Sequence, residues 1–215
     1  MRWLLVVVIA FALLYGRQAV AGDLLVHVAD EAHRPVSDAV ITLTSELAPA
    51  ARHAAPAVKT IDQKNETFLP YVQVLRPGDM AVFRNSDTTR HHVYSFSPVK
   101  SFEFVLRPGE SSPPLTLERV GIAAVGCNIH DHMITYLYVS DADSIAVSGV
   151  DGHATLTDLA PGRYTLHVWH PQLHPGRPEI TQVVQVNEHA APPVAITLSL
   201  LPDPRMQMDR EHIGY

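Results

Sequence analysis

The sequence predicts an all-β fold made of two β-sandwiches. Short runs in which apolar and polar residues alternate recur throughout the chain after residue 21, and this period of two is typical of strands that bury one face. Turn residues separate the runs, among them Pro-Gly pairs at 77–78, 108–109 and 161–162. The one Ala-rich stretch, residues 45–57, is broken by Pro49 and Pro56, so we expect a loop with at most one turn of helix there.

The clearest alternating runs are the predicted strands: Leu24–Val28, Ala39–Leu43, Tyr71–Leu75, Met80–Phe83, Phe102–Leu106, Thr135–Val139, Tyr164–Trp169, Ile180–Val186 and Val194–Leu200. A change in pattern near Asp141-Ala142-Asp143 favours two domains. We place one domain at residues 59–140 and a second at 144–201. Residues 22–58 are then N-terminal strands and a linker, and residues 202–215, which are polar and without pattern, are a flexible tail.

Composition excludes several classes of protein. The 215 residues include 22 acidic and 16 basic side chains, 47% hydrophobic residues and 17 prolines. This is too apolar for a disordered chain, too rich in proline for a coiled coil, and not basic enough for a nucleic-acid-binding arm. We therefore expect a globular protein without a nucleic-acid partner.

The N-terminus has the pattern of a secretory signal. Met1 and Arg2 precede the apolar run Trp3–Tyr15, and Ala19-Val20-Ala21 has the small residues that a signal peptidase requires. The apolar run is shorter than the roughly 20 residues that span a bilayer. Residues 1–21 are thus predicted to be a cleaved signal peptide. The mature protein would then be periplasmic or secreted, with no stable membrane insertion.

Cys127 is the only cysteine, so it has no partner for an intramolecular disulfide. Exported proteins use cysteine mostly in disulfide pairs, because their compartment oxidises free thiols. A bound metal would explain an unpaired sulfur, and a small buried hydrophobic residue is the other explanation.

The seven residues from Cys127 to Met133 place a thiol, an imidazole and a thioether on one predicted loop between strands. Sulfur with imidazole is a ligand set for copper, and a Cys with two His and a weak axial Met is the electron-transfer copper geometry. His130 supplies one imidazole, so a second must come from a distant strand. His91 and His92 are both available there, and strand alternation turns them to opposite faces.

These motifs resemble the cupredoxins. The spacing of Phe83, Asn85, His91 and Val93 is similar to the first-ligand segment of plastocyanin-like members, and Cys-x-x-His-x-x-Met at 127–133 is similar to the ligand loop of amicyanins. The resemblance implies a cupredoxin-type Greek-key sandwich for residues 59–140. It also implies one type 1 copper ion held by four residues: His91, Cys127, His130 and Met133.

A longer resemblance is to exported cupredoxin-containing proteins called methylamine utilization proteins. It rests on residues 91–97, 126–131 and 164–171 and covers roughly residues 23 to 200. The sequence departs from that pattern at His132, where an aromatic residue such as Trp is expected.

The C-terminal part resembles small prealbumin-like sandwiches related to carboxypeptidase regulatory domains. Asp-Gly-x-Ala at 151–154 and Leu-x-Pro-Gly-x-Tyr at 159–164 carry this resemblance, and residues 26–40 are similar to the first hairpin of such a sandwich. The N-terminal hairpin could therefore complete the C-terminal sandwich, with the cupredoxin inserted between its strands. It could equally belong to the cupredoxin.

The predicted function is that of an exported blue copper protein carrying single electrons, with His130 as the edge nearest solvent. Its partner would be a redox protein such as a cytochrome or a dehydrogenase. We expect a carrier rather than an enzyme, because no catalytic motif occurs and a copper oxidase or reductase needs a second metal cluster. The alternative is a non-redox copper-binding protein or a scaffold or adhesion β-sandwich. Asn85 and Asp87 are expected to fix the turn before His91.

Overall fold

A computed structural model describes residues 22–47, 55–176, 180–187 and 192–207. The predicted signal peptide, residues 1–21, lies outside these residues, as do residues 48–54 of the predicted loop and 208–215 of the predicted tail. Within the described ranges, no helix is long and apolar enough to cross a membrane.

The all-β prediction is confirmed, and every predicted strand is present. The strands are β1 (Gly22–Asp30), β2 (Val40–Ser45), β3 (Val58–Gln63), β4 (Phe68–Leu69), β5 (Val72–Leu75), β6 (Met80–Asn85), β7 (His91–Ser97), β8 (Lys100–Leu106), β9 (Leu115–Thr116), β10 (Gly121–Cys127), β11 (His130–Val139), β12 (Ser144–Val147), β13 (His153–Leu159), β14 (Gly162–Trp169), β15 (Ile180–Val186) and β16 (Val194–Leu198), followed by a short 3-10 helix, η1 (Pro204–Gln207).

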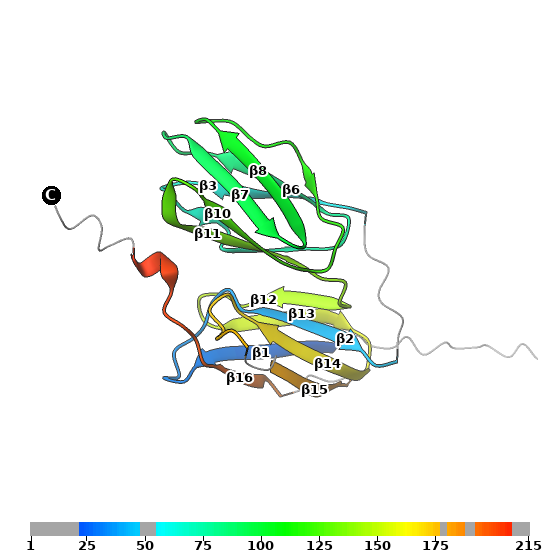
Figure 1. Cartoon of the computed structure of the whole chain (residues 1–215). Coiled ribbons are helices and arrows are strands. Elements are labelled where there is room, and N and C mark those ends of the chain that lie inside the picture. Colours follow the sequence, from blue (N-terminus) through cyan, green and yellow to red (C-terminus); the bar gives the residue numbers. More distant parts are fainter. Residues whose placement is uncertain (1–21, 48–54, 177–179, 188–191, 208–215) are drawn as a thin grey trace, which may run out of the picture.

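Strands β3 to β11 form the first sandwich, in the upper half of Figure 1. One sheet has the order β5-β11-β10-β7-β8 and the other the order β4-β3-β6-β9. The alternating sequence of each strand turns one face inward, and the resulting core includes the fully buried Phe83, Leu117 and Leu137. Cys127 and Met133 belong to the same core cluster.

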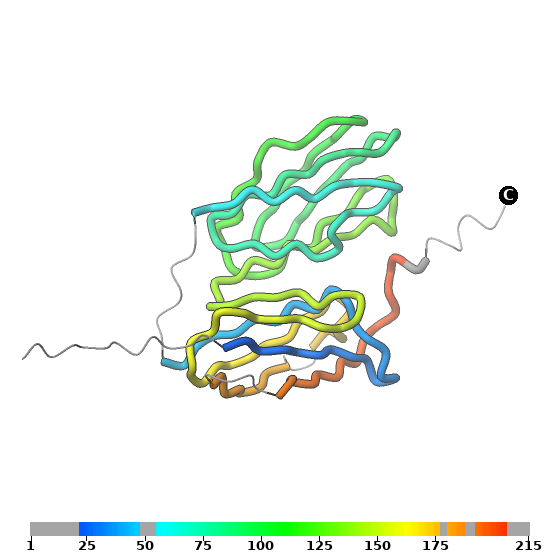
Figure 2. The backbone as a smooth tube through the Cα atoms, turned by 180° about the vertical axis from the view of Figure 1, so that it is seen from behind, coloured from blue at the N-terminus to red at the C-terminus, as the bar shows by residue number. Residues whose placement is uncertain are grey.

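The N-terminal strands lie in the second sandwich, together with the C-terminal ones. In one sheet β1 lies between β13 and β16, and in the other β2 lies between β12 and β14, with β15 at the edge. Figure 2 shows the blue N-terminal strands among the yellow and orange ones. The first sandwich therefore lies, in sequence, between two strands of the second. The resemblance of this second sandwich to prealbumin-like domains stays a prediction.

The two sandwiches pack against each other through aromatic side chains. Tyr136 and Tyr138, on the outer face of β11, contact Trp169 of β14 with ring centroids 5.7 and 5.3 Å apart. Val40 and Tyr71 are buried in the same cluster. The faces of β11 thus have different roles, because its inward residues fill the first core and its outward residues hold the second sandwich.

Residues 202–207 differ from the prediction of a flexible tail. The guanidinium of Arg205 lies 3.5 Å from the centre of the Tyr71 ring, and it forms ion pairs with Asp203 at 2.7 Å and Asp38 at 3.7 Å. A cation over an aromatic ring is favourable, more so when it is partly removed from water. The segment therefore crosses from the second sandwich to the first, although no apolar pattern in the sequence indicates it.

Replacing Trp169 by Ala is expected to lower the free energy of unfolding by about 3 kcal/mol, because the contacts with Tyr136 and Tyr138 are lost. The matched control is Phe96→Ala. Phe96 is 76% exposed, so its removal should change stability by no more than about 0.5 kcal/mol. Urea unfolding followed by circular dichroism measures the free energy of unfolding of both variants. Equal decreases in the two variants would contradict the role given to Trp169.

Candidate metal centre

Three of the four predicted ligands meet at one end of the first sandwich, where His91 begins β7, Cys127 ends β10 and His130 begins β11. Strands β7 and β10 are antiparallel neighbours in which Cys127 lies opposite Val93. Cys127 also pairs with His130 across the turn at residues 128–129. Pairing with both neighbouring strands therefore brings the two imidazoles to the single thiol.

The donor atoms lie close enough for one ion. Cys127 Sγ is 3.7 Å from Nδ1 of His91 and 3.8 Å from Nδ1 of His130, and all three donor atoms lie within 4.8 Å of one another. Both separations are shorter than the sum of the roughly 2.3 Å and 2.0 Å that typical metal–sulfur and metal–nitrogen bonds measure. One sulfur and two imidazole nitrogens, largely buried, suit a soft or borderline metal such as copper.

Strand alternation settles which member of the histidine pair faces the thiol. The His91 side chain is completely buried, whereas the His92 ring points to the other face and contacts Glu103 and Asn128. His91 is therefore the residue that the structure brings to Cys127.

Met133 lies in the buried core beside this group. In the β10–β11 ladder Cys127 pairs with His130, but the preceding Gly126 pairs with Ile134, so residues 131–133 form a bulge without partners on β10. Met133 is the last residue of that bulge and is 1% exposed. Its burial in one cluster with Cys127 is compatible with a ligand role, which stays a prediction.

The turn that precedes His91 is held by a buried amide. The Nδ2 group of Asn85 donates hydrogen bonds to the carbonyl oxygens of Thr89 at 2.8 Å and Leu106 at 3.0 Å, and its Oδ1 accepts the N–H of Asp87 at 2.9 Å. Asn85 itself is fully buried. These bonds fix the path of the chain from β6 into β7, and so the point at which His91 enters the site.

Asp87 joins the first imidazole to a neighbouring loop. The Nε2–H of His91 donates to Asp87 Oδ2 at 2.8 Å, while the backbone N–H groups of Asn65 and Glu66 donate to the same carboxylate. Burial alone would raise the pKa of Asp87, but these hydrogen bonds and the His91 ring hold it below its ordinary value. A donor contact at Nε2 selects the tautomer whose Nδ1 is free to bind a metal.

Glu66 approaches the second imidazole. Its carboxylate oxygens lie 3.6 Å from Nε2 of His130 and 4.0 Å from Nε2 of His132. Burial lowers the pKa of His130 below 6.5, although the charge of Glu66 opposes this shift. A lowered pKa favours the neutral ring, which is the form that can bind a metal. With 19% of its side chain exposed, His130 is also the least buried of the three residues.

Sequence reasoning missed two contacts here. It predicted Asp87 as a turn residue but not as a partner of His91, although their spacing of four residues placed a carboxylate beside an imidazole. It gave no role to Glu66, which lies in the β3–β4 loop, far from His130 in sequence. Nothing in the local pattern of that loop indicates which face of the sandwich it covers.

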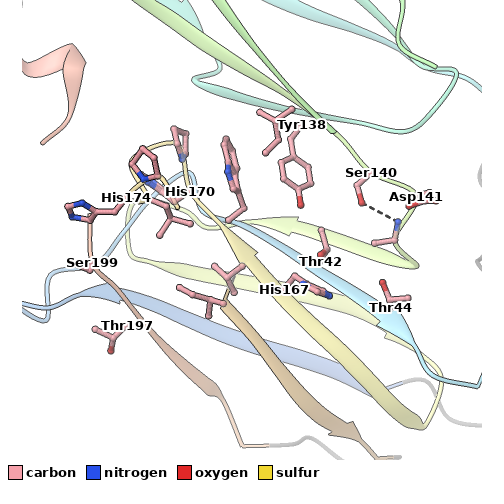
Figure 3. Close-up of a pocket in the computed structure, with 18 of the residues that line it drawn as sticks. Thr42, Thr44, Tyr138, Ser140, Asp141, His167, His170, His174, Thr197 and Ser199 are labelled. Atoms are coloured by element: carbon pink, nitrogen blue, oxygen red, sulfur yellow. Dashed lines mark hydrogen bonds between the residues drawn. The ribbon is translucent and has the colours of Figure 1, made fainter. Parts of the chain in front are cut away.

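A cavity of about 720 Å³ lies elsewhere, between the two sandwiches. Figure 3 shows Tyr138 above and Thr42 and His167 below it. The buried His170 at its edge already has partners for both ring nitrogens, the carbonyl of Ser37 and the N–H of Gln172. Among the described residues, the group of three donors that could hold one ion is His91, Cys127 and His130, none of which lines this cavity, so the cavity is separate from the metal centre.

No known family model and no curated protein matches the chain. Among solved structures, a purple cupredoxin from Nitrosopumilus maritimus aligns at 17% identity, 38% of this chain, 98% of its own and a TM-score of 0.34. An amicyanin variant in the Cu(I) state aligns at 18% identity over 46% of this chain and 98% of its own, with a TM-score of 0.35. A copper-containing nitrite reductase from Thermus scotoductus aligns at 24% identity over 44% of this chain but only 25% of its own, with a TM-score of 0.35. The chain is similar to these proteins over less than half its length.

In the metal-free protein, the His130 ring is expected to titrate below 6.5, and replacing Glu66 by Gln should lower its pKa further, because a nearby negative charge that favours the protonated ring is lost. The control is Glu103→Gln, which removes the carboxylate that contacts His92 and should leave the pKa of His130 unchanged. Histidine ring resonances followed by NMR from pH 4 to 8 decide it. A rise in the His130 pKa on Glu66→Gln would contradict the assignment.

Proposed function

We propose that this protein is a type 1 copper protein of the cupredoxin kind that carries single electrons. The observation that carries the proposal is the meeting of one thiol and two imidazoles, all with donor atoms within 4.8 Å, at one end of a β-sandwich. His91, Cys127 and His130 would hold the ion, and the Met133 thioether would be a weak axial ligand. When bound, copper supplies a one-electron couple between its two oxidation states.

The surrounding chain suits this role because it holds the ligands in position and shields them from water. His91 and Cys127 are 0% and 4% exposed, and hydrogen-bonded strands hold both. Asn85 and Asp87 fix the turn and ring of His91 before any metal binds. Ligands that are already positioned need little rearrangement when the charge of the ion changes, and this favours a carrier over a protein that folds around its metal.

The proposed partner is another redox protein, a cytochrome or a dehydrogenase, that approaches at His130. This ring is the most exposed of the three, and the neighbouring Ile129 is 46% exposed in the turn beside it. An apolar side chain next to a partly exposed ligand suits a brief contact between two proteins. The lone cysteine and the N-terminal pattern support an exported, periplasmic or secreted carrier.

With Cu(II) added, the protein should show an intense visible band from charge transfer between the Cys127 sulfur and copper. Cys127→Ser should abolish the band because the sulfur is gone, while far-UV circular dichroism stays unchanged. His92→Gln is the control and should keep the band, since His92 points away from the site. A protein that binds Cu(II) without a visible band would instead support a storage or scaffold role.

Substitutions of Met133 should move the reduction potential in opposite directions. Gln offers an oxygen ligand that stabilises Cu(II), so the potential should fall, whereas Leu removes the donor and the potential should rise. Leu has a similar volume to Met and should change the free energy of unfolding by less than about 1.5 kcal/mol. Protein-film voltammetry on both variants, compared with wild type, measures the effect. Three equal potentials would make Met133 a core residue only.

A further inference from the structure

Two histidines form a cross-strand pair on the second sandwich, far in the fold from the metal centre. His27 of β1 lies directly opposite His153 of β13, and their ring centroids are 4.6 Å apart with the planes tilted by 41°. The inward neighbours of His27 on β1, Val26 and Val28, are fully buried, so the pair lies on the outer face of the sheet. The other sheet of this sandwich contacts the first sandwich through Val40 and Trp169, so the face that carries the two histidines is not the one packed against the first sandwich.

A carboxylate holds one ring of the pair. Asp151 Oδ2 lies 3.4 Å from Nδ1 of His153, and Asp151 Oδ1 accepts the backbone N–H of the same residue at 3.1 Å. Nδ1 of His153 is thus occupied, and Nε2 remains for a ligand. An imidazole whose far nitrogen meets a carboxylate is the usual arrangement of a metal-binding histidine.

The turn that carries Asp151 is pinned to β1. Gly152 has a φ of 75°, and a side chain there would collide with the carbonyl oxygen of Val28. The Gly152 carbonyl accepts the N–H of Val28 at 2.8 Å. Because the turn is fixed to the strand that carries His27, the two rings and the carboxylate are held in one place by the backbone.

Cross-strand neighbours have Cβ atoms about 4.5–5.5 Å apart, so their side chains interact. With ring centroids 4.6 Å apart, the two imidazoles are close enough to share one ion bound at roughly 2.0–2.1 Å from a nitrogen of each ring. The His153 side chain is 45% exposed, so it contributes little to the core. We propose that His27 and His153 form a second metal site for a divalent cation of the Zn²⁺ and Cu²⁺ class. Asp151 orients His153, and water completes the coordination. Without a thiolate, the site should bind weakly and exchange its ion freely.

The test uses the full chain with Cys127→Ala, so that the thiolate of the metal centre does not compete, and Zn²⁺ as the probe. NMR should show the ring resonances of His27 and His153 shifting together and saturating with a dissociation constant in the micromolar range. His27→Gln or His153→Gln should raise that constant by about tenfold or more, and Asp151→Asn by about tenfold. The control is His33→Asn, at an exposed position with φ of 59° that Asn tolerates.

Ring resonances of His27 and His153 that do not respond to Zn²⁺ would overturn the proposal, as would single-His variants that bind like the parent. Asp151→Asn changes neither β1 nor β13, so it still tests the proposal if His27→Gln or His153→Gln fails to fold. The proposal is also independent of the copper centre. In the chain with Cys127 intact, His27→Gln should leave the visible copper band unchanged.

Discussion

The buried amide of Asn85 is the interaction on which the metal centre depends. Its three side-chain hydrogen bonds reach the turn before His91 and the end of β8, while its backbone accepts the N–H of Gly109 and donates to the carbonyl of Glu110. Removing the side chain would leave buried polar groups without hydrogen-bond partners, and each such group costs about 1–3 kcal/mol of stability. The edge of the sandwich that carries the ligands is thus assembled by hydrogen bonds within the chain.

The two imidazoles that face Cys127 have unequal surroundings. His91 is buried and bonded to Asp87 at 2.8 Å, whereas His130 is partly exposed and lies 3.6 Å from Glu66. Asp87 also accepts the backbone N–H groups of the loop that carries Glu66. One carboxylate therefore fixes the inner ring and places the loop that covers the outer one. The inner side of the site is thus buried and hydrogen-bonded, whereas its outer side keeps a partly exposed ring beside the Glu66 carboxylate.

Sequence patterns predicted the strands and the Cys127–Met133 loop because both are local, whereas His91, 36 residues from Cys127, was expected only from the resemblance to cupredoxins. Alternation marks each strand, and the Cys127–Met133 spacing is short enough to read directly. The same patterns left the place of the N-terminal hairpin open, since the pairing of β1 with β13 and β16 joins distant segments. They also failed for Glu66 and Arg205, which act through single polar contacts from loops. Such contacts have no period and depend on a fold that is already formed.

The pairing of β2 with β12 has a consequence for how this chain could have arisen. Leu43 lies opposite Ser144, and the N–H of Ser45 donates to Asp143 Oδ2 at 2.6 Å, so the points where the chain leaves and re-enters the second sandwich are neighbours. The entire first sandwich thus occupies the tip of a β-hairpin. A tight turn in its place would close the hairpin, and conversely a sandwich with adjacent ends can be inserted into a host protein without cutting its core.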